Sequence, residues 1–139
     1  ECIKNVYKAG IHTEIITLVI EGGNDNKKFV ERMADFLKPL NSEIPWHFTA
    51  CHPAHRMVDI SPTRAETLEK MHGWAKECGM KYVYAGNVAG NPLENTYCPN
   101  CGELLIERRG FGIRKMRLTK EKKCPACSTK IPIAGEVCQ

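Results

Sequence analysis

The sequence predicts an α/β fold of three consecutive β/α units, followed by a small ribbon that four cysteines tie to a metal ion. Apolar segments at 12–20, 46–50 and 81–85 predict three strands, with helical patterns between them. Their centres lie roughly 30 to 35 residues apart, which fits successive right-handed βαβ units. Two Cys-x-x-Cys motifs follow. We therefore expect one unit at residues 1–95 and a metal ribbon at 96–139.

The first ten residues predict the end of a helix. Ile3, Val6 and Tyr7 repeat at helical spacing, and Gly10 stands where a C-cap glycine belongs. The sequence does not open with methionine. We therefore expect the chain to begin inside a helix of a longer protein.

The first β/α unit follows. Residues 14–20 form a nearly continuous run of β-branched residues and leucine, which predicts a parallel strand buried on both faces. The strand ends at a glycine pair, after which Asn24 or Asp25 can cap a helix that closes at Pro39.

The second and third units repeat this pattern. Thr63-x-x-Glu66 predicts a capping box for a helix that ends at Gly79. Three parallel strands alone leave both sheet edges open. Either further strands precede Glu1, which we favour because of the helical start, or a second copy completes the sheet.

The metal prediction depends on Cys98, Cys101, Cys124 and Cys127. The two pairs are 22 residues apart, enough for a β-hairpin with arms at 104–106 and 113–118. Four thiolates at about 2.3 Å suit a tetrahedral ion, and zinc is favoured over iron because such closed sites are usually structural zinc sites. Two disulfides or four unrelated thiols are the alternatives. With four protein ligands, no position stays open for substrate.

Composition narrows the class of protein. No apolar run approaches the length of a membrane span and no signal peptide is present, so we expect a cytoplasmic protein without membrane contact. The remaining four cysteines are expected to be reduced. Residues 1–97 carry 11 basic and 12 acidic side chains, whereas residues 98–139 carry 9 and 4. A basic ribbon can bind nucleic acid, but only Phe111 offers an aromatic surface in that run.

Candidate site residues follow from the rule that ligands bind at the carboxyl ends of parallel strands. This rule selects the following polar residues: Asn24, Asp25, His52, His55 and Asn87. Glu14 and Thr17 lie within the first strand and could point into a barrel. The alternatives are helix caps for Asn24 and Asp25, a turn for Asn87, an exposed loop for His55 and packing for His52.

A family resemblance extends over nearly the whole chain. The resemblance depends on the segment from Glu14 to Asp25 and on the motifs His47-Phe-Thr, His52-Pro and Lys81-Tyr-Val-Tyr-Ala-Gly-Asn87. These are followed by the cysteine motif Tyr-Cys98-Pro-Asn-Cys101. Together they resemble the C-terminal part of the AmmeMemoRadiSam-system radical SAM enzymes, relatives of pyruvate formate-lyase activating enzyme.

The resemblance implies the last three strands of a partial (β/α)6 barrel with the ribbon appended. It implies reductive cleavage of S-adenosylmethionine by a [4Fe–4S] cluster to a 5′-deoxyadenosyl radical. It places Glu14, Thr17 and His52 toward the adenosylmethionine, and Asn24, Asp25 and Asn87 at the rim. The cluster motif Cys-x-x-x-Cys-x-x-Cys is absent from this sequence. We therefore expect catalysis only together with the missing N-terminal half.

The expected partners are that missing half and either a protein substrate of the glycyl-radical type or a small molecule. A second hypothesis also stays open, namely that the chain is a non-catalytic zinc-ribbon module that binds nucleic acid or a partner protein.

Overall fold

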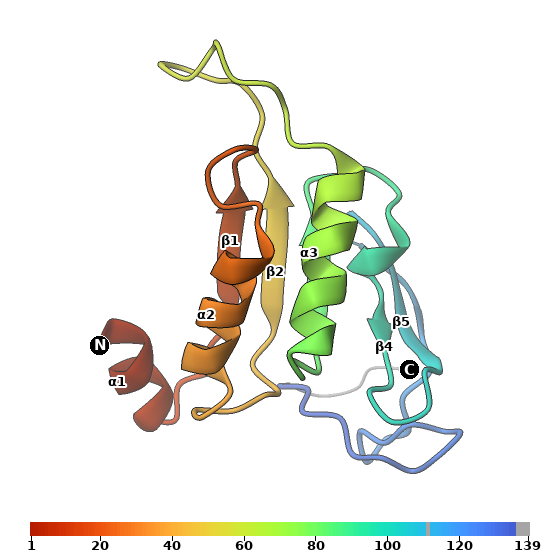
Figure 1. The fold of residues 1–139 in the computed structure, drawn as a ribbon. Coiled ribbons are helices and arrows are strands. Elements are labelled where there is room, and N and C mark those ends of the chain that lie inside the picture. The colour runs from red at the N-terminus through yellow and green to blue at the C-terminus, as the bar shows by residue number, and fades with distance from the viewer. Residues whose placement is uncertain (111, 136–139) are drawn as a thin grey trace.

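Two three-stranded sheets, one parallel and one antiparallel, organise the protein (Figure 1). The computed structural model describes residues 1–110 and 112–135. In chain order the elements are α1 (Cys2–Lys8), β1 (Ile15–Val19), α2 (Lys27–Leu37), β2 (Trp46–Ala50), α3 (Ala65–Glu77), β3 (Val83–Gly86), the 3₁₀ turn η1 (Pro92–Glu94), β4 (Thr96–Tyr97), β5 (Leu104–Arg109) and β6 (Gly112–Met116).

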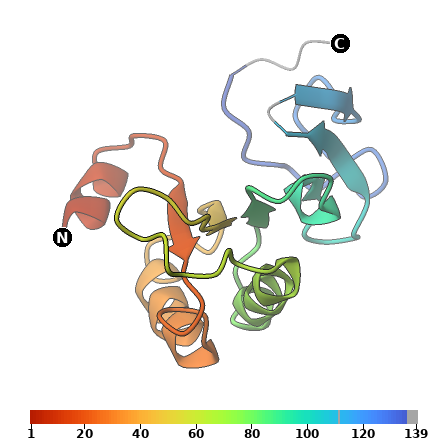
Figure 2. The same cartoon turned by 90° about the horizontal axis from the view of Figure 1, so that it is seen from above.

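The parallel sheet has the order β1-β2-β3, with Ile15 opposite Trp46 and Trp46 opposite Val83. Helices α2 and α3 lie side by side on one face of this sheet, and the ribbon lies on the other side (Figure 2). The predicted order of strands and helices is therefore confirmed. The main core lies between the sheet and these helices; its fully buried members include Val19, Val30, Leu37, Trp46, Phe48, Leu68 and Met71.

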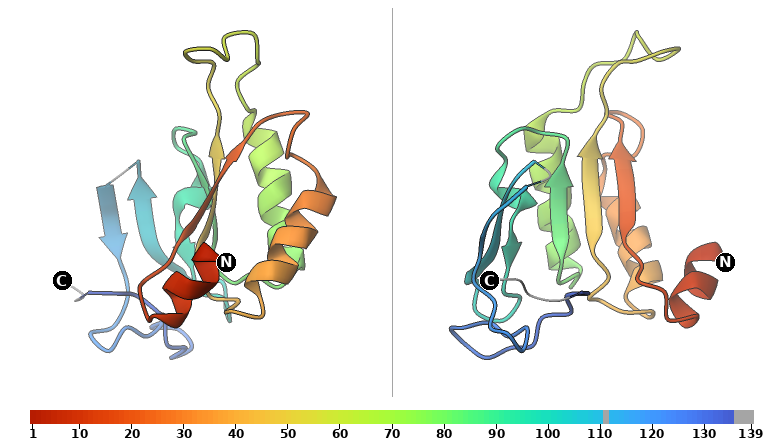
Figure 3. Two further views of the ribbon diagram at one scale, coloured as in Figure 1. Left: turned by 90° about the vertical axis from the view of Figure 1, so that its left-hand side faces the viewer. Right: turned by 180° about the vertical axis from the view of Figure 1, so that it is seen from behind.

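Strand β1 is buried on one face, not on two as its composition predicts. Ile15, Thr17 and Val19 are buried, whereas Ile16 and Leu18 keep 70% and 50% of their surface exposed. Both long helices pack on the same face of the sheet, so nothing in the described residues covers these two side chains. Seen from behind, none of the described helices covers β1 and β2 on the opposite face, and the ribbon lies beside β3 (Figure 3).

The expected partial (β/α)6 barrel is wrong for this chain. The described residues form a small mixed α/β structure, in which three parallel strands make an open sheet and the second sheet is separate and antiparallel. Barrel closure requires tilted strands that hydrogen-bond in a complete ring. Strands β1 and β3 each have one neighbour here, so no ring forms.

The antiparallel sheet has the order β4-β5-β6, and β5 and β6 form the hairpin predicted between the cysteine pairs. It has its own buried cluster, which includes Leu105, Ile106, Leu118 and Ile131. Tyr82, directly before β3, is buried in this second cluster. The ribbon therefore packs against the parallel sheet through Tyr82.

The helix ends differ in detail from the predicted caps. Gly10 takes a left-handed φ of 76° after α1, as predicted. Asn26, not Asn24 or Asp25, caps α2 by accepting a hydrogen bond from Phe29 N at 3.0 Å. The Thr63 capping box does not form, because its hydroxyl instead donates to Val19 O and accepts from Cys51 N.

None of the helices in the described ranges combines the length and the apolar character that a membrane crossing requires.

Candidate functional site

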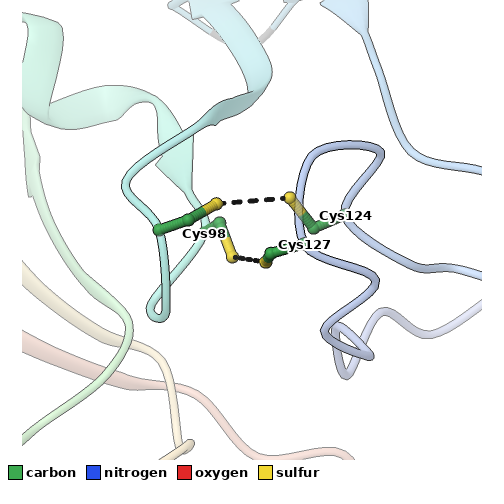
Figure 4. A group of neighbouring side chains, drawn as sticks. Cys98, Cys124 and Cys127 are labelled. Atoms are coloured by element: carbon green, nitrogen blue, oxygen red, sulfur yellow. Dashed lines mark hydrogen bonds between the residues drawn. The ribbon is translucent and has the colours of Figure 1, made fainter.

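Four cysteine sulfurs converge between the two turns of the ribbon, as the sequence predicts (Figure 4). Within each turn the first cysteine carbonyl accepts from the residue four positions later, Gly102 N at 3.0 Å and Ser128 N at 2.9 Å. Gly102 and Ser128 both take left-handed φ angles, 77° and 59°. These two matched turns project two sulfurs each toward a common point.

The spacing of the sulfurs fits a single tetrahedral ion. Cys98 Sγ lies 3.5 Å from Cys127 Sγ, and Cys101 Sγ lies 3.6 Å from Cys124 Sγ. Ligands about 2.3 Å from a tetrahedral zinc would lie about 3.8 Å apart. No disulfide joins the cysteines of the described residues, which excludes the disulfide alternative there. The group can hold a metal ion.

Hydrogen bonding prepares one of these thiols for metal binding. Thr129 Oγ1 lies 3.2 Å from Cys127 Sγ. Hydrogen bonding with the Thr129 and Asn100 side chains lowers the pKa of the Cys127 thiol. A thiol that ionises easily binds a metal more readily at neutral pH, since the thiolate is the ligand.

A second group of polar residues crosses the open face of the parallel sheet. We call it the polar row; its members are Glu14, His47, Tyr84, Thr96 and Arg108. The Glu14 carboxylate lies 3.0 Å from both His12 Nε2 and His47 Nε2. The His47 and Tyr84 rings stack with centroids 4.9 Å apart. The row thus begins at β1 and continues over β2 and β3.

The ribbon completes the polar row. Tyr84 Oη lies 3.1 Å from Thr96 Oγ1, and the Arg108 guanidinium lies 5.8 Å from the centre of the Tyr84 ring. Arg108 Nη1 donates to Thr96 Oγ1 at 2.7 Å. Hydrogen bonds and stacking therefore join the two sheets at this point.

The polar row lines a cavity of about 1090 Å³ between the sheet and the ribbon. Segment 131–134 forms part of its wall, together with Leu18, Thr49 and Asn87. A cavity of this size is large enough for a small-molecule ligand.

Three pKa values along the row depart from their ordinary values, and burial raises that of Tyr84. Burial raises the pKa of Glu14, but hydrogen bonds and charges from His12 and His47 outweigh it and lower the pKa overall. Burial lowers the pKa of His47; Glu14 opposes this effect and Arg108 adds to it. An ionised Glu14 beside a mainly neutral His47 is therefore favoured at neutral pH.

Three of the predicted site residues form hydrogen bonds with the backbone or with a side chain in the core. Thr17 faces the helices and accepts a hydrogen bond from Trp46 Nε1 at 2.9 Å. Asn24 bonds Ile20 N and Leu18 O, and Asp25 accepts from Gly22 N at 3.1 Å. The Asn24 and Asp25 side chains shape the turn after β1.

The other predicted site residues lie on the open face or at the strand ends. Glu14 and Asn87 line the cavity. Asn87 has a φ of 63° and donates its side-chain amide to Ala50 O, so it also forms the predicted turn. His52 Nε2 lies 3.3 Å from Asn87 O. His55 is exposed in the loop after β2, as one of the alternatives predicts.

His47, Tyr84 and Arg108 are not among the predicted site residues. Alternation along β2 and β3 could have identified the first two, because His47 and Thr49, and Tyr84 and Gly86, share one face. Arg108 gives no such signal. It reaches the sheet only because the ribbon packs there.

A curated relative matches nearly the whole chain. No family model matches the chain. The chain is 44% identical over 135 residues to the uncharacterized protein MJ0808 of Methanocaldococcus jannaschii. The match covers 96% of this chain and 40% of the relative. The chain therefore spans well under half the length of the curated relative that it matches.

Proposed function

We propose that this chain is the C-terminal part of a radical S-adenosylmethionine enzyme that resembles pyruvate formate-lyase activating enzyme. The observation that carries the proposal is the helix-free sheet face, where Glu14, His47 and Tyr84 border a cavity of about 1090 Å³. Large concave sites with a few placed polar groups are suited to ligands. The type of reaction is inferred from the linked sequence motifs. The greater length of the relative is consistent with a further segment.

The iron–sulfur cluster of such an enzyme does not fit the residues of this chain. Each cysteine that binds a [4Fe–4S] cluster binds a different iron, whereas the ribbon sulfurs all lie within 4.8 Å of one another, and the three-cysteine motif is absent from this sequence. We therefore assign the cluster, which would supply the electron for cleavage of S-adenosylmethionine, to a segment outside this chain.

The contribution of this chain is to bind and orient a ligand at the sheet face. Of the residues predicted to bind the cofactor, Glu14 and Asn87 line the cavity, so we propose these two as ligand contacts. The substrate, either a partner protein or a small molecule, is not specified by these contacts.

We further propose that the four cysteines bind structural zinc. All four positions around a tetrahedral ion would be filled by Cys98, Cys101, Cys124 and Cys127, which leaves none for a substrate. The ribbon cluster is small, so metal binding would supply much of the free energy that folds it. Elemental analysis should find about one zinc per chain. One iron per chain would overturn the choice of zinc but not the site.

The test of the radical proposal uses the complete protein that contains this chain. The gene should encode a Cys-x-x-x-Cys-x-x-Cys motif upstream of Glu1. After anaerobic reconstitution with iron and sulfide, reduction with dithionite should convert S-adenosylmethionine to 5′-deoxyadenosine, measured by liquid chromatography. Glu14→Gln should weaken S-adenosylmethionine binding, whereas Glu69→Gln, on the exposed surface of α3, should not.

Either of two results would contradict the radical proposal. The gene could encode an initiator methionine directly before Glu1 with no cluster motif upstream. Alternatively, the reconstituted complete protein could hold its cluster and form no 5′-deoxyadenosine.

A further inference from the structure

We propose that Arg108 forms an anion-binding site in the cavity, for a small molecule that carries a carboxylate or phosphate group. This inference goes beyond the proposed function and does not depend on it. It follows from the way in which the guanidinium is held and from the charges around it.

The structure fixes one side of the Arg108 guanidinium. Nη1 donates to Thr96 Oγ1 at 2.7 Å and to Glu94 O at 3.2 Å, while the guanidinium lies 5.8 Å from the centre of the Tyr84 ring. In the described part of the chain, Nε and Nη2 donate to no protein acceptor. An arginine fork held in this way can offer two parallel N–H groups to a carboxylate or phosphate.

The acidic residues around the cavity already have partners. Glu14 lies beside His12 and His47, Glu43 pairs with Lys81 at 3.1 Å, and Glu94 accepts from Gly110 N at 3.2 Å. Within residues 1–110 and 112–135, no ion pair involves Arg108. It is also the single arginine or lysine on the cavity wall there. A guanidinium whose remaining N–H donors have no carboxylate partner among the described residues is the group on this wall that can bind a carboxylate or phosphate.

The neighbouring Arg109 provides a matched control. It follows Arg108 on β5, so its side chain points to the opposite face of the strand, and it is exposed. Arg108→Gln and Arg109→Gln therefore remove the same charge from two faces of one strand. If only Arg108→Gln weakens anion binding, the anion binds in the cavity. Equal weakening in both variants would indicate general attraction to the basic ribbon.

The test is an NMR titration of the zinc-loaded protein with inorganic phosphate and with acetate at constant ionic strength. Acetamide, which is neutral and similar in shape to acetate, is the control ligand. Both anions should give saturable shifts centred on the amides of Tyr84, Arg108 and Gly110. Arg108→Gln should weaken binding about tenfold, the loss expected for a hydrogen bond to a charged group, and Arg109→Gln should leave it unchanged.

Three results would overturn the site: shifts that do not saturate, shifts spread along β6 rather than around the cavity, or equal losses in the two variants. Zinc content and signal dispersion report whether Arg108→Gln keeps the ribbon folded. If that variant unfolds the ribbon, the positions of the shifting amides in the unmodified protein still show whether the anion binds in the cavity. A larger response to phosphate than to acetate would identify a phosphate ligand, and the reverse a carboxylate.

Discussion

The indole N–H of Trp46 donates to the hydroxyl of Thr17 at 2.9 Å, inside the core between the parallel sheet and its helices. Trp46 is fully buried and Thr17 is 8% exposed. This bond explains why a polar residue stands in the middle of the apolar strand β1. It also explains why Thr17 does not border the cavity.

Thr17→Val should destabilise the protein by about 1–3 kcal/mol, because the substitution keeps the shape of the side chain but leaves a buried indole donor without a partner. Urea unfolding of the zinc-loaded protein measures the change. Thr13→Val is the control, since the Thr13 hydroxyl bonds only the nearby Ile11 O at 2.9 Å in an exposed position. Equal stabilities of the two variants would show that the Trp46 bond contributes little.

Cys101→Ser or Cys124→Ser should release the metal and loosen residues 98–131, because either change removes one of four thiolates that hold the ribbon. Elemental analysis and amide hydrogen exchange measure the two effects. Protection in β1, β2 and α3 should persist, since these elements belong to the other core. Cys78→Ser should retain the metal. A Cys101 variant that keeps both its metal and its exchange protection would contradict the four-thiolate site.

The pKa of His47 should respond in opposite directions to its two charged neighbours. Glu14→Gln removes a charge that favours the imidazolium, so the pKa should fall further below its ordinary value. Arg108→Gln removes an opposing positive charge, so the pKa should rise. Partial exposure of these side chains limits the size of both changes. NMR titration of the imidazole measures both pKa changes, with Glu43→Gln as the control. Changes of the same sign would contradict the arrangement of Glu14, His47 and Arg108 in the polar row.

Glu21 should make stability depend on pH in acid. Hydrogen bonds from Thr67 and Arg64 lower its pKa from 4.5 to about 2. Because the folded-state pKa is depressed, this stabilisation is present above pH 4.5 and is lost as the pH falls toward 2. The wild-type protein should therefore exceed Glu21→Gln in melting temperature near neutral pH, and the gap should close in acid.

The thiolates also protonate in acid, so only the difference between the wild-type protein and the Glu21 variant is diagnostic. Glu69→Gln, exposed on α3, should follow the wild-type curve throughout. A gap between wild type and Glu21→Gln that is constant with pH would show that the Glu21 carboxylate is not specifically stabilised.

Local patterns predicted the elements well where the residues involved are close in sequence. Spacing of Ile3, Val6 and Tyr7 identified α1, and the two Cys-x-x-Cys motifs identified the metal group. The capping predictions were less accurate. Asn24, Asp25 and Thr63 are all able to cap a helix, but each found a different backbone partner in the turns of the fold.

The site depended on packing across the chain. Glu14 was predicted from its place within the first strand, whereas Arg108 lies 94 positions later and joins the polar row only through the ribbon. The (β/α)6 barrel was inferred from motifs of a longer family, and the three strands present here form an open sheet.

The sequence by itself determined the order of helices and strands and the four cysteines that can hold a metal ion, because helical and strand periodicity and short cysteine turns act over a few residues. Only the tertiary structure decided that one face of β1 stays open, that Thr17 points into the core, and that Arg108 meets Tyr84. These outcomes depend on which surfaces pack together. Such packing is set by contacts between residues far apart in the chain, which local periodicity does not encode.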